Sequence, residues 1–174
     1  MQATLSRTQL TLVGASYGAV ALLSVALVYW RYLQYSFATE ADKQSAMWGF
    51  GDWMLEFMIL GLFLVPTFVL LLVIAKSEPA SILYSKIVLA FSLTLPLSLG
   101  LMLIPAIAKG WMPGIILMYR VLGAPVVLVG IALSRVMVRY PRAKRLTSYA
   151  LLVELGTMVL MFGSMFSTAM FRKH

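Results

Sequence analysis

The sequence predicts an all-α, polytopic integral membrane protein, built as an antiparallel bundle of five transmembrane helices. Of its 174 residues, 61% are hydrophobic and only 11% are charged, whereas an ordinary soluble domain has about 25% charged residues. The apolar residues fall into five stretches that end near basic residues, and most connections between them are short. We therefore expect a single transmembrane domain over 1–174.

The first two helices are expected at about 10–30 and 53–75. The first stretch ends at Arg31 and is longer than the apolar core of a signal peptide, so we expect a retained transmembrane helix. A polar loop, 34–51, is expected between the two helices. Aromatic residues near its ends, such as Trp30 and Trp48, are typical of rings that lie at the level of the lipid headgroups.

The other three helices are expected at about 87–108, 114–133 and 146–171. Lys86 and Lys109 flank the third apolar stretch, Arg135 follows the fourth, and Arg172 follows the fifth. The connection between the fourth and fifth helices is predicted to be a basic loop, 134–145.

The distribution of Lys and Arg predicts the orientation of the chain. With the N-terminus in the cytoplasm and the C-terminus outside, more than half of the 14 basic residues lie on the cytoplasmic side, as the positive-inside rule requires. The terminal Arg172 and Lys173 favour the opposite orientation. We expect the bacterial cytoplasmic membrane as the location and contact between the basic loop and anionic lipid headgroups. The residues expected to make this contact are Arg135, Arg139, Arg142, Lys144 and Arg145.

Missing residue types exclude most catalytic and metal centres. The chain has no Cys and no Asn, and its only His is His174, so we expect no catalytic residues, no metal and no cofactor. The segment 49–52 reads G-F-G-D, as in intramembrane aspartyl proteases, but the only other aspartate, Asp42, lies in the same predicted loop. Two carboxylates from different helices are needed for that chemistry. Nucleic acid binding is not expected, because no exposed basic face with stacking groups is predicted.

Four prolines predict kinks inside the expected helices. Pro66, Pro96 and Pro125 each lie about 15 Å from a basic residue at a helix end, at 1.5 Å per residue, and therefore near the bilayer midplane. Pro105 adds a second break in the third helix. Each proline removes an intrahelical hydrogen bond and frees a carbonyl. The kinks either improve packing or open a pocket of the kind that transporters build from discontinuous helices.

Arg120 and Glu154 are the two charges that fall deep within the expected hydrocarbon region. An unpaired charge there costs at least about 2.5 kcal/mol on insertion scales, so we expect the two side chains to pair or to face a polar cavity. Glu56, expected near the outer interface, is an alternative partner for Arg120. The pair is either a structural salt bridge or a site for an anionic or protonatable ligand.

Small residues at a spacing of four predict close helix packing. Gly14 and Gly18 form a G-x-x-x-G motif in the first helix, and Gly163 and Ser167 repeat the spacing in the fifth. Such faces admit a neighbouring backbone, which belongs either to this chain or to a second copy or a partner subunit.

Three hypotheses for function follow. The first is a non-catalytic subunit or accessory protein that packs with itself or with a larger membrane complex. The alternative is a small carrier or binding protein for a small or lipophilic solute, including an anionic one, with a midplane site at Arg120 and Glu154. The third is an enzyme that uses Lys86, Ser92 and Glu154, which are expected at different depths and without an orienting partner.

Overall fold

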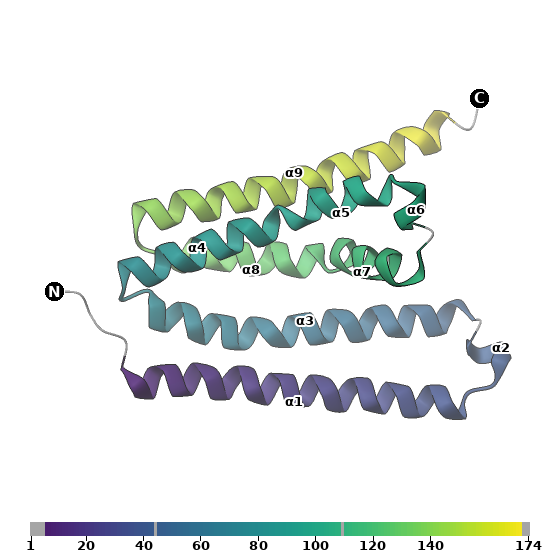
Figure 1. The fold of residues 1–174 in the computed structure, drawn as a ribbon, viewed down its shortest axis with the longest axis horizontal. Helices are drawn as coiled ribbons and strands as arrows, with labels where there is room; N and C mark the ends of the chain where they lie inside the picture. Colours follow the sequence, from purple (N-terminus) through teal and green to yellow (C-terminus); the bar gives the residue numbers. More distant parts are fainter. Residues whose placement is uncertain (1–5, 44, 109, 172–174) are drawn as a thin grey trace. The chain divides into compact units, whose positions relative to one another are not determined.

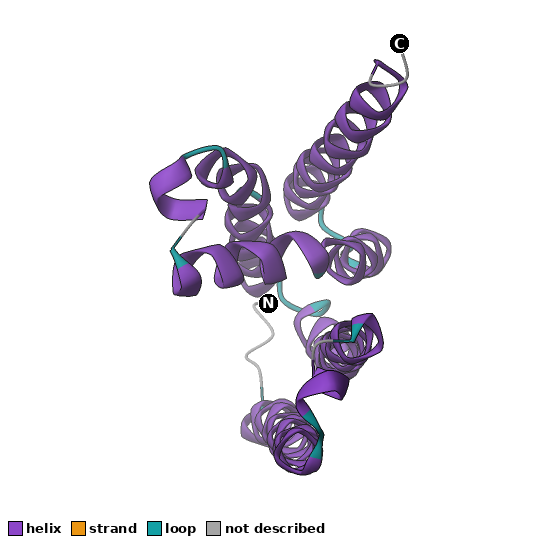
Figure 2. Cartoon of the chain, turned by 90° about the vertical axis from the view of Figure 1, so that its right-hand side faces the viewer, coloured by secondary structure: helices purple, strands orange, loops and turns teal. Residues whose placement is uncertain are grey.

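The computed structural model describes residues 6–43, 45–108 and 110–171, and in this part of the chain every element is a helix (Figures 1 and 2). Four helices are long and apolar enough to cross a membrane, namely Arg7–Phe37, Met47–Ile74, Glu78–Met102 and Pro141–Gly163. A bent pair of helices over residues 113–137 makes a fifth span if it is counted as one. The predicted all-α class is confirmed, with four to five helices long and apolar enough to span a membrane, and the antiparallel arrangement of five spans stays a prediction.

The helices group into two compact units, Met1–Ser77 and Glu78–His174. The first contains α1 (Arg7–Phe37), α2 (Glu40–Lys43) and α3 (Ala46–Ile74), and the second contains α4 to α9. The single transmembrane domain over 1–174 stays a prediction.

The first unit is a hairpin of α1 and α3 that lie side by side (Figure 1). Ser6 caps α1, because its hydroxyl accepts the backbone N–H of Gln9 while the Gln9 side chain accepts the N–H of Ser6. Towards the middle of the hairpin, the Tyr17 and Thr67 hydroxyl oxygens lie 3.1 Å apart. This polar pair links the two helices.

The expected polar loop, 34–51, is mostly helical. Helix α1 continues to Phe37, α3 begins at Ala46, and α2 lies between them. Thr39 and Asp42 cap α2 reciprocally, since the Thr39 N–H and hydroxyl donate to Asp42 Oδ2 at 3.2 and 2.6 Å and the Asp42 N–H donates to Thr39 Oγ1 at 3.2 Å. Polar residues there stabilise helix ends rather than an irregular loop.

The third expected helix, 87–108, begins earlier and is interrupted. It consists of α4 (Glu78–Ser92), α5 (Thr94–Met102) and α6 (Pro105–Ala108). Pro79 does not delay the start, because the first turn of a helix tolerates proline. Pro96 and Pro105 each follow an interruption, since the proline ring cannot accommodate the carbonyl four residues earlier.

The fourth expected helix, 114–133, is divided into α7 (Trp111–Leu122) and α8 (Ala124–Met137), with a bend of 49° between Pro113–Leu122 and Ala124–Met137. The bend lies at Gly123, just before Pro125, as expected for a proline that removes a hydrogen-bond donor. By contrast, Pro66 lies inside α3, which remains continuous. Pro66 is fully buried.

The fifth expected helix, 146–171, is α9 (Pro141–Phe171), which begins five residues earlier. Pro141 is its first residue, so the expected basic loop, 134–145, is reduced to residues 138–140. α9 packs mainly against α4 and α8. Ala143, Thr147 and Ala150 of α9 are fully buried, and their small side chains allow this close approach.

Candidate functional site

A buried ion pair joins α7 to α9. Arg120 lies in the last turn of α7, and its Nη1 and Nη2 atoms donate to Oε1 and Oε2 of Glu154, each at 2.9 Å. The Glu154 side chain is 0% exposed and the Arg120 side chain 11% exposed. Such a bidentate arrangement is the strongest that a guanidinium and a carboxylate adopt. The structure therefore brings together the two deep charges that the sequence singled out.

The break between α4 and α5 supplies further partners for Arg120. The Arg120 Nε atom donates to Thr94 Oγ1 at 2.7 Å, and the Thr94 hydroxyl donates to the Phe91 carbonyl at 2.6 Å. Arg120 Nη2 lies 3.5 Å from the same carbonyl, and the Arg120 Cζ atom lies 4.8 Å from the centre of the Phe91 ring. Sequence reasoning missed Thr94 and Phe91, although their place just before Pro96 was a usable signal.

The break between α7 and α8 follows Arg120 directly. The Gly123 N–H donates to the Tyr119 carbonyl at 2.9 Å, and α8 has Pro125 in its first turn. Because α7 ends there, Arg120 lies at the negative end of a helix dipole, which stabilises a cation. Two helix breaks therefore flank one ion pair.

The two charged groups of this cluster are engaged with each other. A guanidinium stays protonated, and both oxygens of the carboxylate accept hydrogen bonds from it. Neither group is free to act as a nucleophile or as a general base in this arrangement. The cluster can hold three elements together, or it can exchange the carboxylate of Glu154 for another anion.

The carboxylate partner of Arg120 within the second unit is Glu154, and the alternative pairing with Glu56 stays a prediction. Glu56 lies on α3 of the first unit, where its Oε2 atom is buried without a hydrogen-bond partner among the described residues.

A second polar cluster, which sequence reasoning missed, lies at the end of the hairpin. Arg31 Nε donates to Asp52 Oδ1 at 2.7 Å, Nη1 donates to Gln34 Oε1 at 3.3 Å, and Nη2 donates to the Trp48 carbonyl at 2.8 Å. The Arg31 Cζ atom lies 4.1 Å from the centre of the Trp48 ring. Gly51 leaves room for this guanidinium, since a Cβ atom there would lie 3.0 Å from Arg31 Nη2.

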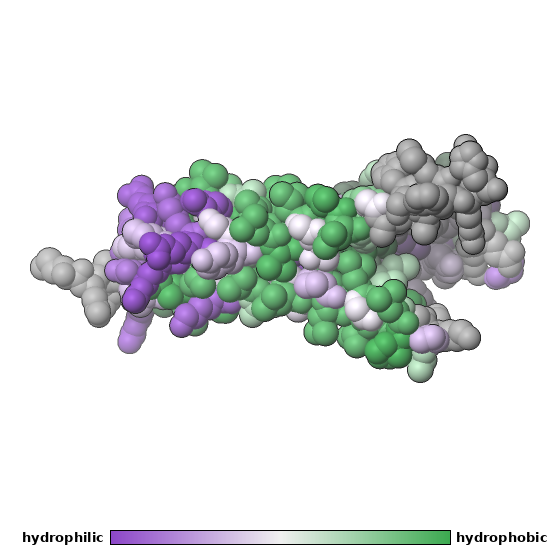
Figure 3. All heavy atoms as spheres, turned by 90° about the horizontal axis from the view of Figure 1, so that it is seen from above, coloured by the Kyte–Doolittle hydropathy of each residue, from purple (hydrophilic) through white to green (hydrophobic). Residues whose placement is uncertain are grey.

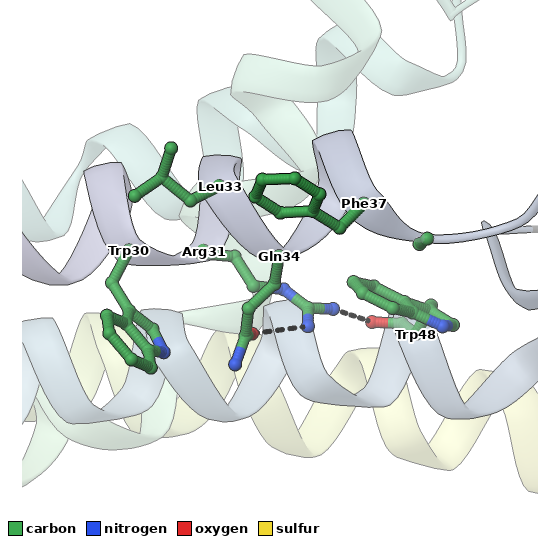
Figure 4. A pocket seen from close by; sticks show the side chains of 7 residues that line it. Trp30, Arg31, Leu33, Gln34, Phe37 and Trp48 are labelled. Atoms are coloured by element: carbon green, nitrogen blue, oxygen red, sulfur yellow. Dashed lines mark hydrogen bonds between the residues drawn. The ribbon is translucent and has the colours of Figure 1, made fainter.

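Beside this cluster is an open pocket of about 700 Å³. Figure 4 shows the Arg31 side chain directed from α1 towards α3, with the Trp30 and Trp48 rings on either side of it. The residues that line the pocket are Trp30, Arg31, Leu33, Gln34, Phe37, Ala38 and Trp48. Aromatic rings and a paired cation are typical of the headgroup level of a membrane protein.

The residues considered for catalysis have other partners. Asp52 is paired with Arg31, and Asp42 caps α2. The Ser92 hydroxyl donates to the Val88 carbonyl of its own helix at 3.0 Å, and Lys86 is exposed on α4. No group of three or more His, Cys, Asp or Glu side chains that could hold a metal ion occurs within the described ranges.

The glycines predicted to pack helices have open space around them in the described part of the chain. A Cβ atom built at Gly14, Gly18 or Gly163 would meet no atom of the described residues within 4 Å, apart from those of its own helix backbone and chain neighbours. Gly163 lies on α9, and the side chain of Ser167 lies outside the described residues. Close packing within the chain is achieved elsewhere, by buried residues of α4 such as Ser81 and Ser85.

No protein-family model matches the chain, and neither the curated proteins nor the solved structures contain a match to it.

Proposed function

We propose that the chain is a non-catalytic integral membrane protein that associates through α1 with a further membrane helix, from a second copy or a partner subunit. The observation that carries this proposal is the unoccupied face at Gly14 and Gly18. Along the whole of α1, Ser24 is the buried residue. A G-x-x-x-G face lets two backbones approach closely in lipid, where apolar side chains alone provide no driving force.

Cysteine cross-linking tests this association, because the chain has no native cysteine. Leu22 and Leu23 are both exposed, but at about 100° per residue Leu22 lies about 40° around α1 from Gly18 and Leu23 about 140°. We expect Leu22→Cys to form a disulfide-linked dimer in membranes and Leu23→Cys not to do so. Adding Gly14→Leu and Gly18→Leu to Leu22→Cys should abolish the dimer.

If the partner is a different chain, Leu22→Cys gives no disulfide-linked homodimer. The particle purified in mild detergent should then have a mass greater than that of one chain, and this excess should disappear when both glycines are replaced by leucine. A strictly monomeric particle without a copurifying protein would contradict the proposal.

The proposed topology has five antiparallel spans, with α7 and α8 forming one bent span. The N-terminus lies in the cytoplasm and the C-terminus outside, in the bacterial cytoplasmic membrane. The basic residues around the turn at 138–140 support this orientation through the positive-inside rule. Reporter fusions that are active on one side of the membrane test it, since a re-entrant α7–α8 pair would leave both termini on the same side.

A second candidate, a small carrier or binding protein, is favoured by the two helix breaks that flank Arg120 and Glu154. Discontinuous helices surround substrate sites in many transporters. An anionic solute would replace Glu154 on the guanidinium. Carboxylates of increasing chain length should then raise the thermal midpoint of the wild-type chain and not that of Arg120→Gln, and equal effects on both would eliminate this function.

A further inference from the structure

The junction of α8 and α9 concentrates positive charge on a well-packed turn. The turn itself, residues 138–140, is anchored on both sides, because Val138 is 2% exposed and Ala143 is 0% exposed. The Val138 N–H donates to the Ser134 carbonyl at 3.0 Å, and the Lys144 N–H donates to the Tyr140 carbonyl at 2.9 Å. The cations attached to this turn are therefore held in place by the packing of their backbone.

Five basic residues surround this turn and are not neutralised within the described part of the chain. Arg135 donates to Ser148 Oγ at 2.6 Å, which fixes its side chain without balancing its charge. Arg139, Arg142 and Arg145 are exposed. Elsewhere, Arg31 pairs with Asp52 and Arg120 with Glu154, whereas no described carboxylate lies within 4.0 Å of the basic groups at this junction.

The start of α9 adds to the positive potential. Arg142 and Arg145 lie one turn apart at the beginning of the helix, and the first turn contains no acidic residue. The N-terminus of a helix carries a partial positive charge, so cations there are destabilising unless anions from outside the chain approach them. Figure 3, viewed onto the α9 side, shows hydrophilic residues gathered at the end where α9 begins and hydrophobic residues over the adjacent length.

The position along α9 identifies the source of the anions. The start of α9 lies about 20 Å from Glu154 along the helix, at 1.5 Å per residue. The hydrocarbon core of a bilayer extends about 15 Å from its midplane, and the headgroups lie just beyond it. Arg142 and Arg145 lie about 18 and 14 Å from Glu154 along the helix, at 1.5 Å per residue. If Glu154 is placed near the midplane, their long side chains can therefore reach the headgroup region.

We propose that Arg139, Arg142 and Arg145 bind the headgroup of an anionic phospholipid at the α8–α9 junction. The guanidinium groups donate to the phosphate oxygens, for which their planar geometry is suited. Arg135 and Lys144 add positive potential at the edge of the site. The site binds lipid whether or not α1 associates with another helix, so it is independent of the proposed function.

The test uses the full-length chain in detergent with equal amounts of phosphatidylglycerol and phosphatidylcholine, and native mass spectrometry measures the ratio of the two lipids retained. We expect wild type to retain more phosphatidylglycerol. Each of Arg139→Gln, Arg142→Gln and Arg145→Gln should lower this preference about fivefold, from the attraction of one basic residue to an anionic leaflet. Arg7→Gln, which removes an isolated exposed cation at the start of α1, is the matched control and should leave the ratio unchanged.

A triple Arg→Lys variant at the same three positions separates charge from geometry and should keep most of the preference. Circular dichroism and the thermal midpoint of each variant show that it is folded. A ratio that is unchanged in the folded triple Arg→Gln variant, or that falls equally in Arg7→Gln, overturns the proposal. Displacement of phosphatidylglycerol by millimolar inorganic phosphate would also overturn it in favour of a site for soluble anions.

Discussion

Glu154 and Arg120 depend on each other for their stability in the folded chain, and a double-mutant cycle measures this dependence. Glu154→Ala leaves Arg120 with its bonds to Thr94 and Phe91 but removes both bonds to the carboxylate. Hydrogen bonds to charged groups contribute about 1.5–3 kcal/mol each, and removing one partner of a buried pair costs about 3–5 kcal/mol. Because Arg120 is 11% exposed and keeps two other contacts, we expect the lower end of that range, about 3 kcal/mol.

The reverse change, Arg120→Gln, leaves the fully buried Glu154 without its counterion and should cost at least as much. Replacing both residues removes both buried charges, so the double variant should lose less stability than the sum of the single variants. We expect a coupling energy of at least about 2 kcal/mol. Thr157→Val is a matched control on α9, because the Thr157 hydroxyl donates to the Val153 carbonyl of its own helix.

The assay is reversible unfolding of the purified chain in mixed micelles of detergent and sodium dodecyl sulfate, followed by circular dichroism. If the losses of unfolding free energy in the two single variants add up to the loss in the double variant, with a coupling energy below about 0.5 kcal/mol, the reasoning is refuted. In that event each charge would be solvated independently, and the pair would not join α7 to α9 energetically.

Two other predictions concern the hairpin. Gly49→Ala should stabilise the chain by up to about 1 kcal/mol, because alanine is the better helix former and the new Cβ atom would meet no atom of the described residues within 4 Å, apart from its own helix backbone and chain neighbours. Gly51→Ala should lose this gain because its Cβ atom displaces Arg31, and equal effects in the unfolding assay would contradict this contact. The hydrogen bonds from Thr39 hold the pKa of the Asp42 carboxyl below its ordinary value. The stabilisation that the α2 cap contributes is therefore fully present above the unfolded-state pKa of Asp42. It is lost as the pH falls through the lower folded-state pKa, below about pH 4. An NMR titration of the Asp42 carboxyl checks this, and an unchanged pKa in Thr39→Ala would contradict it.

The sequence was sufficient to predict an all-helical chain with helices long and apolar enough to span a membrane, because hydropathy is a direct physical requirement of a membrane span. The positions of the helix ends were harder to predict from the sequence. Proline at the start of a helix is tolerated and proline inside it is disruptive, so Pro141 opens α9 while Pro125 divides α7 from α8. Pro66 illustrates a third outcome, a continuous helix, which depends on neighbours that the sequence does not reveal.

The candidate site was partly predictable for a similar reason. Arg120 and Glu154 stand out because charges are costly in hydrocarbon. Thr94 did not stand out, since a hydroxyl in a membrane helix commonly bonds to its own backbone. Its role depends on the break before Pro96, which directs it to Arg120. The pair of Arg31 and Asp52 was missed because each residue alone reads as the marker of a helix end.

The length of the hairpin helices limits what water-borne molecules can reach. α1 has 31 residues and α3 has 29, which at 1.5 Å per residue is about 44–46 Å. A bilayer with its headgroups is about 40–45 Å thick, so each helix is long enough to span the headgroup regions as well as the apolar core. In the proposed membrane placement, the short segment around α2 connects the two helices outside the bilayer, which makes it a suitable place for an epitope tag or a cleavage site.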